Sequence, residues 1–233
     1  MILGFSCVGL AQQEPQFTQY MFNRLSYNPA YAGSSGSICL TAMYRNQWLG
    51  LTLDSPAPTI EAGSTPVDYH ASFDMPVKFL HGGIGLSFTS DKIGYHNAFW
   101  AAVDYAFRIY WGPGNLAAAV EASLFNCSLD YSQLVGSSQL SGDYENPIGS
   151  ASDPMLNGDA NSSDMLFDVS TGLYYQVPGT FYVGLSVKNL LASKSEAIRW
   201  QNARNIYLMG GYEYTIPANP SYKLKPSALI KMA

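Results

Sequence analysis

Strict alternation of apolar and polar side chains is the feature that most constrains how this chain folds. Residues 98–111, AFWAAVDYAFRIYW, place apolar side chains at the odd positions, whereas the even positions include both charges, Asp104 and Arg108. Successive side chains of a β-strand point to opposite faces, so a period of two predicts a strand with one apolar and one polar face. Residues 115–127 repeat this pattern and carry Glu121 on the polar face.

Most of the predicted strands are long enough to cross a membrane. A tilted strand of about 9–11 residues spans the hydrocarbon of a bilayer, whereas strands of soluble sheets are usually about 5–6 residues long. The strand patterns cover residues 37–50, 82–90, 98–111, 115–127, 165–177, 181–188, 205–216 and 223–232, with a weaker one near TIEAGSTP at 59–66. They predict an all-β fold, a transmembrane antiparallel β-barrel of the outer membrane.

The charged residues of these strands are expected to face the lumen of the barrel. Each falls out of phase with the bulky apolar residues of its strand, and a charge that faces the lipid midplane costs about 2–4 kcal/mol. The expected lumen-facing residues are Arg45, Asp104, Arg108, Glu121, Asp168, Lys188 and Glu213. A soluble exported β-sandwich is an alternative, because period two does not say which face is wet. Partition of the mature protein into buffer without detergent would support that alternative.

A low charged fraction favours a membrane protein. Only 12% of the 233 residues are charged, against about a quarter in ordinary soluble domains, while 47% are hydrophobic. The net charge of −5 leaves no basic patch, so nucleic acid is not an expected partner. After residue 11 no apolar run approaches the ~18 residues of a membrane helix. A bilayer would therefore be crossed by strands.

Aromatic residues and loop lengths also follow the outer-membrane pattern. Interfacial girdles are expected from Trp48, Trp100, Tyr110, Trp111, Tyr131 and Tyr174. Short turns are predicted at 112–115, 177–180 and 217–221. The polar segment 132–164 is predicted to be an external loop.

The N-terminal residues indicate export. Residues 1–11, MILGFSCVGLA, form a short apolar stretch that ends in a small residue and is typical of a signal peptide remnant. Residues 12–36 follow as a polar, aromatic and turn-rich segment, expected at the periplasmic end or inside the lumen, and the barrel is assigned to 37–233. Within that segment Asn28-Pro29 disfavours helix and favours a turn or an extended chain.

The sequence contains no pattern typical of catalysis or of a bound cofactor. The glycines of GGIGLS at 82–87 have dinucleotide-fingerprint spacing, but no helix start follows them. His70, His81 and His96 are scattered and no C-x-x-C occurs, so no metal site is expected. Cys39 and Cys127 allow one disulfide without requiring it. We therefore expect a protein that is not an enzyme and that needs no cofactor.

The opening segment carries ordered motifs. They are Glu14, Pro15, Gln16 and Phe17; Tyr20 to Asn23; Asn28 to Gly33; and Arg45, Gln47 and Trp48. Together with GGIGLSFTSDKIG at 82–94 and LKPSALIK near the end, they resemble the PorP/SprF family, outer-membrane proteins of the type IX secretion system of Bacteroidota. One departure is Arg24, which stands where the family often has proline.

The resemblance implies a secretion component. It implies a barrel that binds or anchors secreted cargo through the cargo's C-terminal sorting domain. It also implies contacts with periplasmic components of the machine, and some members of the family serve gliding motility. The candidate partner-binding residues are Pro15, Gln16, Phe17, Tyr20, Phe22, Asn28, Pro29, Tyr31, Arg45, Gln47 and Trp48. A diffusion porin or a small-solute uptake barrel is the alternative, and large, stable currents in planar bilayers would favour it.

The strand count bears on how the barrel closes. The patterns give about nine strands, whereas single-chain bacterial barrels have an even number. An antiparallel ring cannot close with an odd count. We therefore expect the full-length protein to continue beyond residue 233 with further strands.

Overall fold

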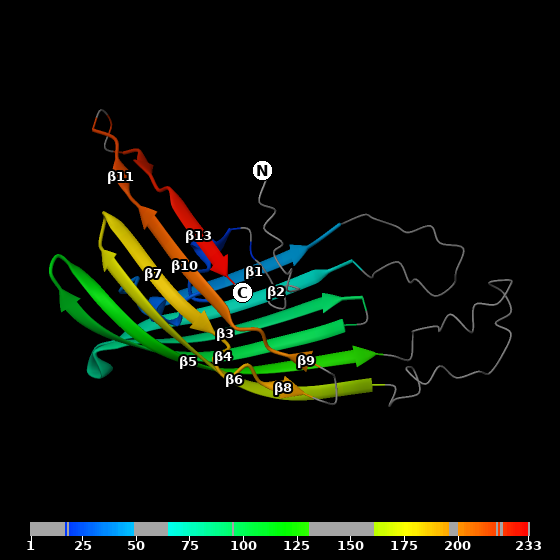
Figure 1. Ribbon diagram of the computed structural model, residues 1–233. Coiled ribbons are helices and arrows are strands. Elements are labelled where there is room, and N and C mark those ends of the chain that lie inside the picture. The colour runs from blue at the N-terminus through cyan, green and yellow to red at the C-terminus, as the bar shows by residue number, and fades with distance from the viewer. Residues whose placement is uncertain are drawn as a thin grey trace, which may run out of the picture.

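The computed structural model describes residues 17, 19–48, 65–94, 96–130, 161–195, 200–217, 219 and 221–232. These residues form one curled sheet of nine strands in the order β1-β2-β3-β4-β5-β6-β7-β10-β13 (Figure 1). The strands are β1 (Cys39–Asn46), β2 (Val67–Val77), β3 (Gly82–Ile93), β4 (His96–Trp111), β5 (Gly114–Asp130), β6 (Asn161–Val177), β7 (Phe181–Lys188), β10 (Asn205–Tyr212) and β13 (Ser227–Met232). All neighbours are antiparallel, which confirms the expected all-β antiparallel fold.

Shorter elements complete the described part of the chain. β8 (Lys194–Ser195) pairs with β9 (Trp200–Gln201), and β11 (Tyr214–Thr215) pairs with β12 (Lys223–Leu224). The described residues also contain three 3-10 turns, η1 (Tyr20–Phe22), η2 (Pro29–Tyr31) and η3 (Lys78–Leu80). Among the described residues, no helix is both long enough and apolar enough to span a membrane.

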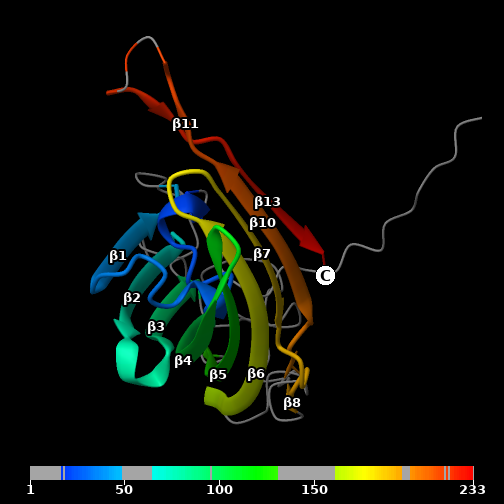
Figure 2. The same ribbon diagram turned by 90° about the vertical axis from the view of Figure 1, so that its left-hand side faces the viewer.

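The sheet is curved like half a barrel. Figure 2 shows it bent into a trough, with residues 19–33 on its concave side. β1 and β13 stand at opposite ends of the strand order, and the two strands do not pair with each other in the part that the structure describes.

The two faces of the sheet differ as the alternation predicts. On β4, Asp104 is 1% exposed on the concave face, whereas the adjacent Val103 is 57% exposed on the convex face. The register pairs Asp104 with Glu121 and Val103 with Ala122, so both faces continue onto β5. The convex face is therefore apolar and open, and the concave face is polar and covered.

One strand of the sheet was not predicted. β2 occupies Val67–Val77, whereas the sequence suggested a strand at 59–66. Residues 59–64 lie outside the described residues, and Thr65 and Pro66 precede β2. A period-two signal was present in β2, because Asp68, His70, Ser72 and Asp74 are buried at alternate positions.

Three other boundaries differ from the prediction. The strand expected at 205–216 is divided, since β10 ends at Tyr212 and β11 leaves the main sheet to pair with β12. The strand expected at 223–232 is divided in the same way, with Pro226 between β12 and β13. β6 begins at Asn161, so the last four residues of the predicted loop 132–164 belong to a strand.

Only some of the residues expected in an aromatic girdle are exposed. Trp48, Tyr110 and Trp111 are 61%, 93% and 62% exposed. Tyr174 is only 2% exposed, and Trp100 turns inward to pack on Phe125, with ring centroids 4.9 Å apart. Both residues are in phase with the buried polar positions of their strands, so the alternation overrides their place near a strand end. Tyr131 lies outside the described residues.

We expect lipid to cover the convex face, and a charge placed there tests this. Val103→Arg, in the middle of β4, should lower the free energy of unfolding in a bilayer by about 2–4 kcal/mol, whereas Ile109→Arg near the end of the same face should cost about 0–1 kcal/mol. Urea titration of the protein in lipid measures both. Small and equal effects, within about 0.5 kcal/mol, would place this face in water.

Candidate functional site

Residue 17 and residues 19–33, here called the inner segment, lie on the concave face of the sheet (Figure 2). η2 contacts β4, β5 and β6. The buried apolar side chains of the segment include Tyr20, Leu25, Tyr27, Ala30 and Ala32. They pack on the concave face of the sheet, here called the wall, at Ala106, Ala117, Ala119, Tyr174, Tyr207 and Met209. Alanines in β4 and β5 leave the space that the segment fills.

Asn28 fixes the turn at the centre of the inner segment. Its side-chain oxygen accepts from the amide of Ala30 at 2.9 Å, which caps η2, and its Nδ2 donates to the carbonyl oxygen of Leu173 at 3.0 Å. Glycines face it, because a Cβ at Gly172 would lie 2.2 Å from Asn28 Oδ1 and one at Gly184 would lie 2.7 Å from its Nδ2. The wall is therefore shaped to this side chain.

One end of the inner segment is held through its backbone. Arg108 donates from both terminal nitrogens, to the carbonyl oxygens of Ala32 and Gly33, at 2.8 Å each. The Asp74 carboxylate accepts from the amide of Gly33 at 2.9 Å. Charge-assisted bonds of this kind are stronger than neutral ones. A cation and an anion of the wall thus bind adjacent peptide groups.

Ser26 and Tyr27 of the inner segment are also held through their backbone carbonyl oxygens. Lys188 donates to the carbonyl oxygen of Ser26 at 3.1 Å and pairs with Glu121 at 3.0 Å. Ser186 donates to the carbonyl oxygen of Tyr27. Buried peptide groups need such partners, because an unpaired one costs about 1–3 kcal/mol.

His70 links the inner segment to β3. Its Nε2 lies 3.2 Å from the Ser26 hydroxyl and its Nδ1 lies 2.8 Å from the Thr89 hydroxyl. The Phe17 ring packs against the imidazole, with centroids 5.1 Å apart. The histidine thus has a structural partner on each nitrogen.

The charged residues that we expect to line a lumen fall into two groups. Arg45, Asp104, Arg108, Glu121, Asp168 and Lys188 lie in strands of the main sheet, and Asp104, Glu121 and Asp168 are 1–2% exposed. Asp168 accepts from the amides of Leu191 and Ser193, so it orders the connection after β7. Glu213 instead lies between β10 and β11, outside any strand. That this set lines a lumen stays a prediction.

The candidate partner-binding residues also differ in accessibility. Phe17, Tyr20, Asn28, Pro29 and Tyr31 pack against the concave face, Arg45 pairs with Asp68 at 3.3 Å, and Gln47 accepts from Arg45 at 2.9 Å. Phe22 and Trp48 are 69% and 61% exposed, so these two offer aromatic surface. Pro15 and Gln16 lie outside the described residues. Their roles in binding a partner stay predictions.

Three residues that contact the inner segment were not expected from the sequence to do so: His70 and Asp74 of β2 and Ser186 of β7. Asp74 and His70 belong to the strand that was not recognised, and Ser186 was not singled out among the polar residues of its strand. A period-two search of 67–77 would have placed Asp74 and His70 on the same face as Asp104.

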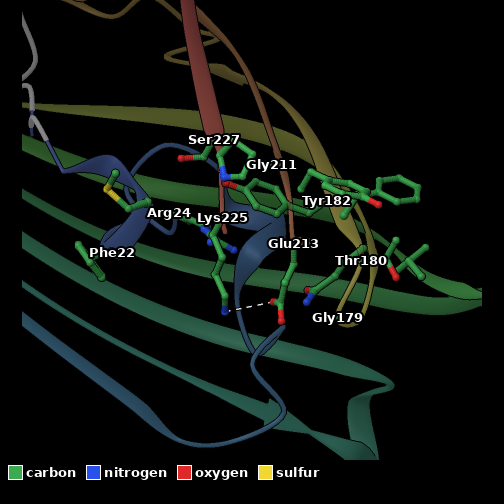
Figure 3. Close-up of a pocket in the computed structure, with 15 residues that line it drawn as sticks. Phe22, Arg24, Gly179, Thr180, Tyr182, Gly211, Glu213, Lys225 and Ser227 are labelled. Atoms are coloured by element: carbon green, nitrogen blue, oxygen red, sulfur yellow. Dashed lines mark ion pairs between the residues drawn. The ribbon is translucent and has the colours of Figure 1, made fainter. Parts of the chain in front are cut away.

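A pocket of about 500 Å³ opens between the inner segment and the wall (Figure 3). Met21, Phe22 and Arg24 line it from the inner segment, and the β6–β7 turn, β10 and β13 supply the opposite side. Glu213 lies at its rim and pairs with Lys223 at 2.6 Å and with Lys225 at 3.1 Å. Hydrogen bonds from these lysines lower the pKa of Glu213. The carboxylate therefore stays charged, and the pair persists, as the pH falls below the ordinary pKa of glutamate.

Chemistry-bearing side chains are otherwise sparse. In the part of the chain that the structure describes, no group of three or more His, Cys, Asp or Glu residues could hold a metal ion. Cys39 and Cys127 are both free thiols, so the disulfide that the sequence allows is not formed. The Sγ of Cys127 lies 3.2 Å from the Nε2 of His96, and Cys127 belongs to a cluster of apolar and aromatic side chains.

Fold and site together define a barrel-type membrane protein whose polar concave face is filled by its own chain. The chain belongs to the PorP/SprF family: the family model described as type IX secretion system membrane protein PorP/SprF matches residues 9–233. This confirms the resemblance seen in the opening motifs. No curated protein and no solved structure matches the chain.

The fit of the inner segment can be tested with two glycines. Gly184→Ala places a Cβ 2.7 Å from Asn28 Nδ2 and 2.9 Å from Tyr174 and Met209, whereas Gly210→Ala meets nothing closer than 3.6 Å. We expect Gly184→Ala to cost about 1–3 kcal/mol of overpacking and to loosen the segment. The rate of trypsin cleavage after Arg24 in the native protein measures this. Equal rates in the two variants would contradict the packing described above.

Proposed function

We propose that this protein is a non-enzymatic outer-membrane component of the type IX secretion system that binds or anchors secreted cargo through the cargo's C-terminal sorting domain and contacts periplasmic components. The observation that carries the proposal is the inner segment on the concave face. Arg108 and Lys188 of the wall donate to backbone carbonyl oxygens of the inner segment, so the concave face is covered by the protein's own chain. This arrangement favours a role in docking other proteins.

The same observation argues against the alternative of a diffusion porin. A porin keeps a water-filled channel lined by polar side chains. Here Asp74 of β2, Arg108 of β4 and Lys188 of β7 are bonded to backbone groups of residues 26–33, and Ala30 and Ala32 are fully buried. Free passage of solute along the described wall would require the inner segment to leave.

Loop lengths suggest an orientation. Outer-membrane barrels have short periplasmic turns and longer external loops. The β4–β5 and β6–β7 turns lie at the same end as η3 (Figure 1), whereas β5 ends at Asp130 and β6 begins at Asn161 at the other end, with 30 residues between them in the chain. Phe22 lines the pocket at the short-turn end, opposite Gly179 and Thr180 of the β6–β7 turn. We assign that end to periplasmic components and the end that carries Trp48 to cargo.

A secretion assay tests the proposal. In a strain that lacks the gene, we compare the full-length wild type with Phe22→Ala, and we measure release of a reporter that carries the sorting domain. Phe22→Ala should lower release severalfold at unchanged protein level, because an exposed aromatic anchor contributes strongly to an interface.

Phe79→Ala is the matched control. Phe79 is 89% exposed on η3, at the same end of the sheet but outside the pocket. We expect it to leave secretion unchanged. Normal release in the strain without the gene, or equal behaviour of the two variants, would reject the assigned role.

A further inference from the structure

Arg24 is a cation held between aromatic rings in the pocket. Its guanidinium carbon lies 4.1 Å from the centroid of the Tyr182 ring and 5.6 Å from that of Tyr31, and one terminal nitrogen lies 3.5 Å from the Tyr174 hydroxyl. Stacking on aromatic faces stabilises a guanidinium without neutralising it. Figure 3 shows Arg24 among the side chains that line the pocket.

The described residues supply this cation with no counter-ion. The ion pairs among them join Arg45 to Asp68, Lys188 to Glu121, and Glu213 to Lys223 and Lys225. Glu213, the acid that lines the same pocket, is thus already shared by two lysines. The Nε of Arg24 is buried without a hydrogen-bond partner.

The nearby phenols do not replace the missing anion. Burial raises the pKa of Tyr31, against the opposing effect of Arg24, so its hydroxyl stays neutral. A partly buried charge that lacks an anion is costly, and a guanidinium fork is shaped to accept a carboxylate or phosphate through two hydrogen bonds. The site is therefore incomplete without an anionic group.

We propose that the pocket beside Arg24 binds a carboxylate carried by a segment of a protein partner, with an apolar side chain of the same segment packed on Met21 and Phe22. The volume of about 500 Å³ accommodates a few residues. Met21 and Phe22 are 39% and 69% exposed, so apolar surface stands next to the cation.

The position of the pocket favours a protein segment over a lipid headgroup. Tyr182 is in phase with Gly184 and Ser186, which are buried on the concave side of β7, whereas Phe181 and Val183 point outward. Lipid would contact the outward set. A lipid phosphate on the convex side therefore lies across the sheet from Arg24.

The site joins two parts of the molecule. Arg24 and Phe22 belong to the inner segment, and Tyr182 and Ser227 belong to the wall. An occupant would bridge them and strengthen the seating of the segment.

Peptide retention tests the inference. Full-length protein is immobilised in phosphatidylcholine nanodiscs and exposed to two pools of acetylated, amidated hexapeptides of Phe, Leu, Tyr and Ser, identical except for one central Asp or Asn. Mass spectrometry of the retained peptides should show the Asp pool enriched about tenfold over the Asn pool, as expected for a charge-assisted pair. Arg24→Gln should abolish the enrichment.

Two controls sharpen the result. Arg204→Gln makes the same change at an exposed arginine in the connection between β9 and β10, and it should keep the enrichment. Phe22→Ala removes an exposed side chain, so it does not depend on Arg24→Gln folding, and it should lower retention of the Asp pool severalfold.

Several results would overturn the inference. They are equal retention of both pools, enrichment that survives Arg24→Gln, or Arg24-dependent retention of radiolabelled dihexanoyl phosphatidic acid without retention of either pool. The inference rests on the proposed function only in taking the occupant to be protein. Failed retention with a secretion defect in Phe22→Ala rejects the inference alone, and retention without any secretion defect rejects the proposed function alone.

Discussion

The concave face of the sheet carries buried charges and must be given partners for them. Arg108 and Lys188 meet this need by donating to backbone carbonyl oxygens of the inner segment, and Asp74 accepts from a backbone amide. Taking an ion out of water costs several kcal/mol unless it is paired and hydrogen-bonded. The inner segment and the polar wall therefore depend on each other.

Because the inner segment packs against the polar wall, small residues are needed in the wall to make room for it. Side chains on one level of the wall come from neighbouring strands in register, as Asp74, Gly85, Asp104 and Glu121 do. A Cβ at Gly85 would lie 2.9 Å from the Asp104 carboxylate and 3.1 Å from Leu25, so glycine makes room for both. The glycines and alanines of the wall determine where the inner segment lies.

Much of the fold could be predicted because period two is a local property. The faces of β4, β5 and β7 follow from alternation alone, and the same rule explains why Trp100 and Tyr174 point inward although both were expected in a girdle. β2 was missed although its alternation is as clear as that of β4. The breaks at Glu213 and Pro226 depend on a hairpin that leaves the sheet, which local periodicity does not encode.

The site was harder to predict because its contacts join residues far apart in the chain. The motifs identified residues 20–33 as a special segment. They did not indicate that Asn28 would be buried against Gly172 and Gly184, nor that Arg24 would lie beside Tyr182. These placements arise only when the sheet curls around the inner segment.

Amide hydrogen exchange of the full-length protein in lipid tests the central claim most directly. If the inner segment fills the concave face, the amides of Ala30 and Gly33, bonded to Asn28 and Asp74, should be protected to an extent comparable with those of β5. Exchange of residues 20–33 at the rate of an exposed loop, while β5 remains protected, would contradict the account.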